Sequence, residues 1–433
     1  MLFKSTRSDD TVSFKKAILK GCPLDGGLFI PASVPDMRQF FLYMDSGTVY
    51  TELVSAISPS FLEGDVNPIV AARVAESAFD FEPEVQQLDE KFSILKLYNG
   101  PTGVFKDFGI AFLAAIIEEL NNDKVMVLTA ARHDTGVSIA RAFRGRKNIT
   151  AVILYPSGPI RGLDESVFVQ NGGNIIPIQI KGYFDDCQRI IRSAMLDRGF
   201  AERYNITSAN AVNVGRLLPQ AFYYLYAFVK LKKSIADDLV FSVPCGNFGN
   251  LIAGLYAWKF GLPVHGFIAA MNANNSFGDF FSGRTFNPAL TPLITNSPAM
   301  DVCYPSNYER MFSFYQESPA VMRNMVFSEA VDDTTTIKTI RSAWEKFGIL
   351  LNPHSAVAFA AAEQAFAEKD NGSHCVVLAT GHPAKFADFV SRITGQNITI
   401  PQEFAMLKNI SKPTALIPAE LDALESSIAA AAG

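Results

Sequence analysis

A lysine in an apolar setting is the first residue of this sequence with a clear chemical use. Lys106 lies between Phe105 and Phe108, in segment 100–108, and the apolar run GIAFLAAII that follows predicts a helix. An apolar pocket at the positive end of a helix lowers the pKa of an ammonium group, and a neutral amine forms a Schiff base with an aldehyde. Taken alone, the segment is explained more often by a Lys106–Asp107 pair that caps the helix, because structural lysines outnumber catalytic ones.

A glycine-rich turn at 244–250, reading PCGNFGN, is a candidate anion site. It follows a predicted strand and precedes an apolar run that predicts a helix. Glycines let backbone N–H groups turn toward one point, and a helix N-terminus adds positive potential. Ligands of open α/β sheets bind at such strand ends. The candidate phosphate-binding residues are Gly246, Asn247, Phe248, Gly249 and Asn250; the alternative is an ordinary connecting turn.

A second strand end carries the segment ATGHPAKF, residues 379–386. The hydroxyl of Thr380 is a candidate hydrogen-bonding partner for a ring nitrogen of a ligand. His382 is either a base or, as is more common for a lone histidine before a proline, a structural residue. The segment therefore adds one candidate ligand and one open alternative.

The segment NAVNVGRLLPQ, residues 210–220, offers a candidate anion clamp. A guanidinium group binds a phosphate or carboxylate at two points, so Arg216 suits either anion. The alternative is an ordinary surface arginine. The aromatic run AFYYLYAF that follows predicts a core helix rather than a cofactor contact.

Short β-rich runs alternate with helical patterns over most of the chain, at 125–131, 149–156, 174–180, 239–246, 264–272 and 375–381. Continuous apolar strands separated by helices predict parallel sheets covered on both faces. Pro177 weakens the third run as a central strand. The first part of the chain lacks this rhythm, which predicts an appended lobe, and 272–305 predicts an irregular excursion near a site. We divide the chain into lobes at 1–95, 96–225 and 226–433.

The composition excludes several classes of protein. The chain has 433 residues, of which 48% are hydrophobic, and a net charge of -5, which argues against a nucleic-acid binder. Five cysteines without a CxxC argue against a metal site or disulfide framework and favour the reducing cytoplasm. The start of the chain has no apolar signal region, and the longest apolar run, 109–117, is too short to span a membrane. Walker and complete GxGxxG motifs are absent.

Together these segments resemble the threonine synthase family, which are pyridoxal-phosphate (PLP) enzymes. The resemblance is carried, in the family's order, by STR with SFKKAILKG and LDGGLFIP, then by NGPTGVFKDF, LYPSGPI, FDDCQ, NVGRLLPQ, PCGNFGNLIAG, NPHSAVA and ATGHPAKF. No segment is decisive alone, but their order is specific. The resemblance implies an α/β, tryptophan-synthase β-like fold (PLP fold type II), with parallel sheets covered by helices, two main lobes and an N-terminal appended lobe.

The resemblance also implies roles for the candidate residues. Lys106 matches the lysine that forms a Schiff base with the cofactor and then moves protons on the substrate. Residues 246–250 match the loop around the cofactor phosphate, and Thr380 matches the partner of the pyridine nitrogen. Arg216 and Asn210 resemble residues that hold the substrate phosphate. The implied reaction converts O-phospho-L-homoserine and water into L-threonine and phosphate.

One loop departs from the family pattern T-S-G-D-T-G. The sequence reads Ala131, Arg132 and His133 where the family has Thr-Ser-Gly, and then keeps Asp134 and Thr135. The family's loop receives the substrate carboxylate and lies against the cofactor. We expect Asp134 on the cofactor side and Thr135 and Arg132 on the substrate side. Two alternatives stay open: either the side chain of Arg132 pairs with the carboxylate, or the loop has swung outward and the site is degraded. Bulk at position 133 would instead obstruct the close backbone approach that glycine permits.

Three hypotheses therefore remain open from the sequence. The first is an active threonine synthase acting on a small phosphorylated amino acid, as a monomer or homodimer. The second is a PLP enzyme of the same fold with another amino-acid substrate, selected by the altered loop. The third is a non-catalytic relative that binds PLP or a phosphorylated metabolite. Cofactor binding is the expectation that the first two share.

Overall fold

The computed structural model describes residues 1–62, 64, 66–131, 134–157, 172–235, 238–368, 372–402, 404 and 413–432. Near the N-terminus, β1 (Leu2–Ser5) pairs antiparallel with β2 (Thr11–Ser13) on one side and β3 (Phe29–Pro31) on the other. Helix α1 (Phe14–Lys20) follows at once, because the side chain of Ser13 accepts a hydrogen bond from Lys16 N at 3.3 Å and caps its first turn. This small sheet lies within residues 1–95, which the sequence assigns to an appended lobe.

A six-stranded sheet forms the larger of the two parallel layers. Its order is β12 (Val326–Ala330), β11 (Gly266–Met271), β10 (Leu239–Pro244), β13 (His374–Ala379), β5 (Phe92–Lys96) and β4 (Glu84–Gln87). Only the edge strand β4 runs antiparallel to its neighbour. Alternate residues of β10 enter two separate cores: Val240 packs in the one with α16 (Pro353–Glu368), and Phe241 in the one with α11 (Gly249–Lys259). Helices therefore bury both faces of the sheet.

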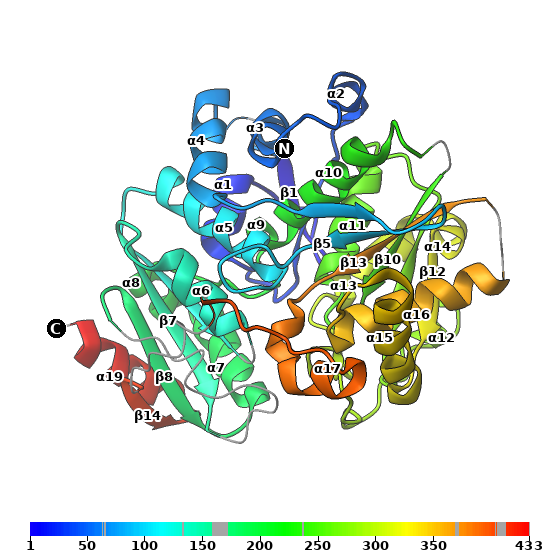
Figure 1. Cartoon of the computed structure of the whole chain (residues 1–433). Helices are drawn as coiled ribbons and strands as arrows, with labels where there is room; N and C mark the ends of the chain where they lie inside the picture. Colours follow the sequence, from blue (N-terminus) through cyan, green and yellow to red (C-terminus); the bar gives the residue numbers. More distant parts are fainter. Residues whose placement is uncertain are drawn as a thin grey trace.

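A five-stranded parallel sheet forms the second layer, on the other side of the molecule (Figure 1). Its order is β14 (Ala415–Pro418), β8 (Ile175–Lys181), β7 (Ile149–Pro156), β6 (Val125–Ala130) and β9 (Ile206–Thr207). Helices α7 (Phe184–Leu196) and α19 (Leu421–Ala432) share one core with it. On its other face lie α5 (Lys106–Leu120) and α6 (Thr135–Phe143). The predicted architecture of parallel sheets covered by helices is confirmed.

The six strands predicted from the sequence all form, as β6, β7, β8, β10, β11 and β13. Pro177 does not keep β8 from an inner position, because β8 lies between β7 and β14. The carbonyl of Pro177 accepts a hydrogen bond from Thr414 N at 2.8 Å, and the β14 ladder begins one residue further on, at Ala415 opposite Ile178. The missing N–H of Pro177 thus lies where that ladder starts, and its absence breaks no bond within the ladder.

The remaining helical segments connect and cover the sheets. They are α2 (Arg38–Tyr43), α3 (Tyr50–Phe61), α4 (Pro68–Ala78), α8 (Arg198–Tyr204), α9 (Val214–Leu217), η2 (Leu218–Gln220), α10 (Ala221–Leu231), α12 (Gly278–Phe281), η3 (Pro298–Met300), α13 (Tyr308–Glu317), α14 (Pro319–Met325), α15 (Asp333–Phe347), η4 (Pro383–Phe386) and α17 (Ala387–Thr394). Helix α5 is central: residues 107–117 are all buried, against α4, α6 and α9 among others. Its first residue is therefore held by elements from several parts of the chain (Figure 1).

Each parallel sheet draws strands from distant parts of the sequence. β4 and β5 join the sheet of β10 and β13, and β14 joins the sheet of β6 and β7. Strands from either side of residues 95 and 225 therefore pair with one another. The division of the chain into lobes at these two positions remains a proposal. No helix among the described residues is long and apolar enough to cross a membrane.

Candidate active site

One pocket of about 190 Å³ collects the predicted site residues. It is bordered by the carboxyl ends of β6, β10 and β13 and by the N-termini of α5, α6 and α11. The predicted residues that line it are Lys106, Asp134, Thr135, Asn210, Arg216, Gly246, Asn247, Phe248, Gly249, Asn250 and Thr380. Arg132 and His133 lie outside the described residues. Every predicted site residue that the structure describes therefore lies in the same cavity.

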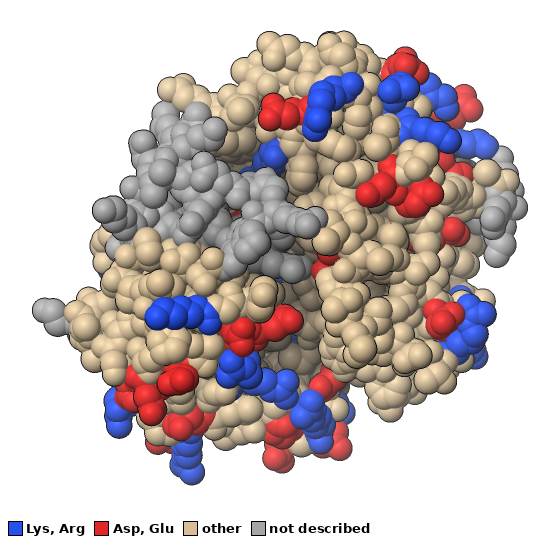
Figure 2. Space-filling model, turned by 90° about the horizontal axis from the view of Figure 1, so that it is seen from below, with Lys and Arg blue, Asp and Glu red and all other residues tan. Residues whose placement is uncertain are grey.

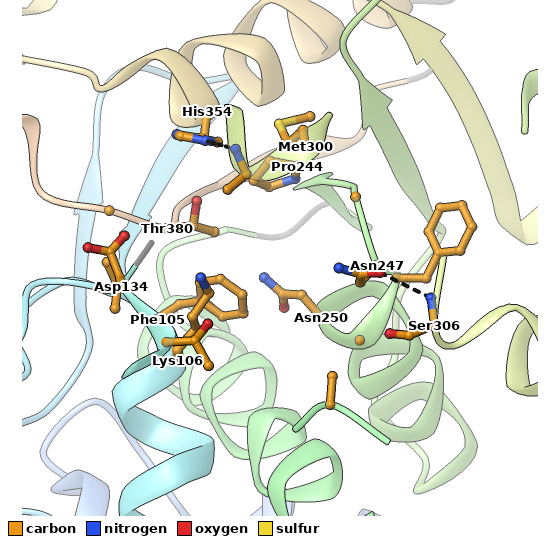
Figure 3. A pocket seen from close by; sticks show the side chains of 18 of the residues that line it. Phe105, Lys106, Asp134, Pro244, Asn247, Asn250, Met300, Ser306, His354 and Thr380 are labelled. Carbon is orange, nitrogen blue, oxygen red and sulfur yellow. Dashed lines mark hydrogen bonds between the residues drawn. The ribbon is translucent and has the colours of Figure 1, made fainter. Parts of the chain in front are cut away.

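Lys106 is held in place by the strand end that carries Thr380. Val104 forms an antiparallel bridge with Gly381, and Phe105 N donates to Thr380 O at 2.9 Å. α5 then begins at Lys106 itself, so its ammonium group projects from the first helical turn into the pocket (Figure 3). The two segments that the sequence offered separately are thus bonded together by their backbones.

Asp107 does not serve as the partner that the capping alternative requires. Its carboxylate is buried and accepts hydrogen bonds from Thr102 N at 2.9 Å and Thr102 Oγ1 at 2.6 Å. Thr102 Oγ1 also lies 2.7 Å from Ser138 Oγ on α6. Burial raises the pKa of Asp107, against the lowering by these hydrogen bonds. The carboxylate of Asp107 thus holds the turn before α5, whereas the side chain of Lys106 lines the pocket.

The glycine-rich turn has the geometry of an anion cradle. Phe248 adopts a left-handed conformation, φ 58° and ψ -4°, directly before helical Gly249, and this succession turns backbone N–H groups to one side. Its ring packs edge-on against Phe277 at 4.6 Å, which holds the unfavourable backbone in place. A Cβ on Gly246 would lie 3.0 Å from Ala299 O, a tighter contact than most side chains make, so glycine favours the close approach of the excursion 272–305 to the turn. The predicted position of that excursion beside the site is confirmed.

Asn247 and Asn250 are oriented by different parts of the chain. Asn247 Oδ1 accepts from Ser306 N at 3.0 Å, and its carbonyl accepts from Asn307 Nδ2 at 3.0 Å. Asn250 is buried, and its Nδ2 has no hydrogen-bond partner among the described residues. A buried N–H group without a partner is costly, so this atom requires an acceptor that the described residues do not supply.

Arg216 is a buried cation on the same wall. It is 5% exposed, donates from Nη1 to Ala209 O at 2.7 Å, and has no hydrogen-bond partner for Nε. Burial lowers its pKa to about 10, and no described carboxylate forms an ion pair with it. Asn210 closes a two-bond ring with Ala130 at the end of β6, accepting at 2.9 Å and donating at 2.7 Å. A buried guanidinium that pairs with no carboxylate among the described residues is suited to an anionic ligand.

The structure adds information on two residues near Thr380, His382 and Lys385. His382 Nδ1 accepts from Ala384 N at 3.0 Å, and burial lowers its pKa to about 4, which favours the structural alternative over a base. Lys385, to which the sequence gave no role, lines the pocket and pairs with Asp134 at 2.6 Å. Their side chains are only 7% and 16% exposed. This pair joins the start of α6 to η4 across the pocket.

Family models and known proteins match the chain over its whole length. A model of pyridoxal-phosphate dependent enzymes matches residues 82–381, and models of the threonine synthase N-terminus and C-terminal region match residues 2–79 and 355–428. Threonine synthase of Serratia marcescens is 36% identical, covering 98% of this chain and 97% of its own length. The chain belongs to the threonine synthase family. Threonine synthase of Saccharomyces cerevisiae is 29% identical, with 99% and 97% covered.

Solved structures agree with this assignment to the threonine synthases. The crystal structure of threonine synthase from Escherichia coli superimposes with a TM-score of 0.89, at 34% identity and 100% coverage of both chains. The PLP-bound threonine synthase of Brucella melitensis gives 0.88 at 28% identity, covering 99% of this chain and 98% of the other. The predicted fold class, with the N-terminal lobe and the PLP-dependent lobes, is confirmed.

The residues of the pocket fit the family's cofactor. Pyridoxal phosphate carries a dianionic phosphate and an aldehyde, and the pocket offers the left-handed turn at Phe248, the unpaired Nδ2 of Asn250 and the amine of Lys106. The family's PLP dependence therefore agrees with the donor groups present. The sequence analysis gave Lys385 no role, although the segment ATGHPAKF contains it. Its ion pair with Asp134 joins two distant segments, and no local pattern indicates that pairing.

Proposed function

We propose that this pocket converts O-phospho-L-homoserine and water into L-threonine and phosphate. The observation that carries the proposal is the combination in one cavity of an amine, a turn suited to a phosphate and a separate buried cation, Arg216. A phosphorylated substrate would supply the negative charge that faces Arg216. The family's reaction provides one phosphate on the cofactor, for the turn at 246–250, and a second phosphate on the amino-acid substrate, for Arg216.

Lys106 is the proposed proton carrier. Bound pyridoxal phosphate would supply an aldehyde for amines and a ring that withdraws electrons from the substrate's α carbon. Lys106 Nζ, at the first turn of α5, would accept the proton from that carbon and return protons at the neighbouring positions. Since α5 is buried from Asp107 onward, its first turn is fixed, and Lys106 would reach adjacent carbons from one anchored position.

The proposed substrate contacts divide the pocket into two ends. Arg216, with the remaining N–H of Asn210, would hold the γ-phosphate and stabilise its charge as it leaves. Thr135, the first residue of α6, would receive the substrate carboxylate at a helix N-terminus. Arg132 lies outside the described residues, and its role toward the same carboxylate remains a proposal from the sequence. Asp134, held by Lys385, would fix this end of the pocket on the cofactor side.

Thr380 is the proposed partner of the cofactor's ring nitrogen. It is 7% exposed and lines the pocket, and its hydroxyl makes no hydrogen bond with a described residue. A neutral hydroxyl does not place a full proton on the ring nitrogen, so it would limit the charge drawn into the ring. That property favours elimination and replacement over transamination.

We further propose that the protein acts in the cytoplasm, as a monomer or homodimer, without nucleic-acid or metal partners. All five cysteines are free thiols, which suits a reducing compartment. No cluster of His, Cys, Asp or Glu among the described residues is suited to a metal ion.

Phosphate release from O-phospho-L-homoserine by the purified, PLP-loaded protein tests the reaction. We expect equal amounts of phosphate and L-threonine, detected by a phosphate assay and amino-acid analysis. O-acetyl-L-homoserine, which lacks the phosphate, is the matched control and should turn over poorly. Turnover of other amino acids without phosphate release would contradict the proposal and favour the second hypothesis; PLP binding without any turnover would favour the third.

A further inference from the structure

The aromatic run that the sequence assigns to a core helix also reaches the active site. Tyr223 and Tyr224 lie on α10 and are fully buried. Tyr223 Oη lies 2.6 Å from Asn250 Oδ1, and Tyr224 Oη lies 2.8 Å from the same atom. Tyr224 Oη is also 3.0 Å from the carbonyl oxygen of Asn250. Two tyrosine hydroxyls on α10 therefore contact the side chain of Asn250, which belongs to the glycine-rich turn.

The chemistry of the two phenols decides which atom of the Asn250 amide faces them. Burial raises the pKa of both hydroxyls well above the ordinary value, so each keeps its proton and donates it. Separations of 2.6 and 2.8 Å are close to the commonest O–H···O distance, whereas N–H···O bonds are most often about 2.9–3.0 Å long. The other contact of Tyr223, to Gln220 Oε1, is 3.3 Å. Asn250 Oδ1 is therefore the main acceptor of both protons.

The nitrogen of the amide consequently faces away from the tyrosines. Asn250 Nδ2 is buried and has no hydrogen-bond partner among the described residues. Figure 3 shows it directed into the pocket, with the nitrogen of Lys106 on the facing side. A donor fixed in this direction suits an anionic oxygen of a molecule that lies between the two nitrogens.

We propose that Tyr223 and Tyr224 are positioning residues, which fix the Asn250 amide as a hydrogen-bond donor to an anionic oxygen of pyridoxal phosphate. The proposal rests on the cofactor role of the 246–250 turn. Without the two hydroxyls the amide is free to rotate by half a turn. Its oxygen would then face the anion, and the donor would be lost.

The test is the affinity of the ligand-free protein for pyridoxal phosphate, measured by absorbance titration, together with the thermal midpoint of each ligand-free variant. Asn250→Ala should weaken binding about tenfold, as expected for one hydrogen bond to a charged group. The double variant Tyr223→Phe with Tyr224→Phe should weaken it by about the same factor. In the Asn250→Ala background, the two tyrosine changes should cause no further loss, because the group they orient is gone.

Tyr226→Phe is the matched control. Tyr226 lies on the same helix, but its hydroxyl donates to Glu82 Oε2 at 2.9 Å, away from the pocket. This variant should bind pyridoxal phosphate like the wild type at a similar cost in thermal midpoint. Unchanged affinity in the double tyrosine variant, or an undiminished loss in the Asn250→Ala background, would overturn the positioning role while leaving the proposed function intact. A wild-type protein that does not bind pyridoxal phosphate would overturn both.

Discussion

Arg216 illustrates how a single residue reveals a missing partner. Its guanidinium group is buried, lines the pocket and has no described carboxylate beside it. Isolated buried charges cost several kcal/mol, so proteins keep them where a ligand supplies the opposite charge. The sequence predicted Arg216 as an anion clamp or a surface residue, and only its burial distinguishes the two. The surface alternative is therefore wrong.

Arg216→Gln should raise the KM for O-phospho-L-homoserine by about 30-fold or more, because it removes the charged partner of a desolvated anion. Its affinity for pyridoxal phosphate should change by less than about threefold, since the cofactor's phosphate is assigned to the 246–250 turn. Steady-state phosphate release and a cofactor titration measure the two effects. A lower kcat with unchanged KM would contradict the assignment.

His382 makes the stability of the fold depend on pH. Burial lowers its pKa to about 4, below the ordinary value of about 6.5. Between these pH values the unfolded chain takes up a proton that the folded chain does not, so stability falls as the pH falls. His382→Asn keeps a side-chain acceptor for Ala384 N but cannot be protonated.

The advantage in unfolding free energy of wild type over His382→Asn should therefore be smaller at about pH 5 than at about pH 7, by about 1 kcal/mol after allowance for solvent screening. Urea denaturation at both pH values measures the difference. An equal advantage at the two values would show that His382 titrates normally in the folded protein.

At the scale of elements, the contact between α5 and α9 sets the position of Lys106 relative to Arg216. A Cβ at Gly109 would overlap with the backbone oxygen of Arg216, so the helices approach each other this closely only because residue 109 is glycine. Lys106 begins the first of these helices and Arg216 lies in the second. Their spacing is therefore fixed by backbone packing as well as by side chains.

Gly109→Ala should destabilise the protein by about 1–3 kcal/mol, as overpacking does, and should also lower kcat, because it separates the two helices. Gly278→Ala is the control: its nearest neighbours would lie 3.9 Å away, which is ordinary contact. Denaturant unfolding and steady-state kinetics measure both variants. Equal effects of the two substitutions would contradict the role given to the helix contact.

Local sequence patterns predicted the helices, strands and turns, but not the contacts between segments that are far apart in the sequence. The buried strands, the start of α5 and the glycine-rich turn are encoded in short runs of residues, so the sequence predicted them. The pairing of Asp134 with Lys385 and the contacts of Tyr223 and Tyr224 with Asn250 join segments far apart in the sequence. No local pattern contains that information, and the sequence therefore assigned the tyrosines to the core alone.

At the scale of the whole molecule, the pocket lies between two sheets, and each sheet contains strands from separate parts of the sequence. Figure 2 shows the surface hollowed between the two halves of the molecule, with basic and acidic residues intermixed around the opening. The ion pair of Lys385 with Asp134 joins the two halves at the pocket. The C-terminal segment returns to the five-stranded sheet as β14 and α19, which the sequence did not predict.

Leu424→Ala should destabilise the protein by about 2–5 kcal/mol, because this side chain is fully buried between α19 and the sheet. Leu416→Ala, at a 50% exposed position on β14, should change stability by less than about 0.5 kcal/mol. Chemical denaturation of the two variants gives the comparison. A small effect of Leu424→Ala would mean that the C-terminal helix is not part of the cooperative fold.

The most direct test of the account is the identity of the amine that reacts with the cofactor. The PLP-loaded protein should be reduced with borohydride, digested and mapped by mass spectrometry, with Lys106→Ala as the comparison. The account predicts a pyridoxyl adduct on Lys106 in the wild type and no stoichiometric adduct in the variant. An adduct on another lysine, or an equal amount of adduct in Lys106→Ala, would contradict it.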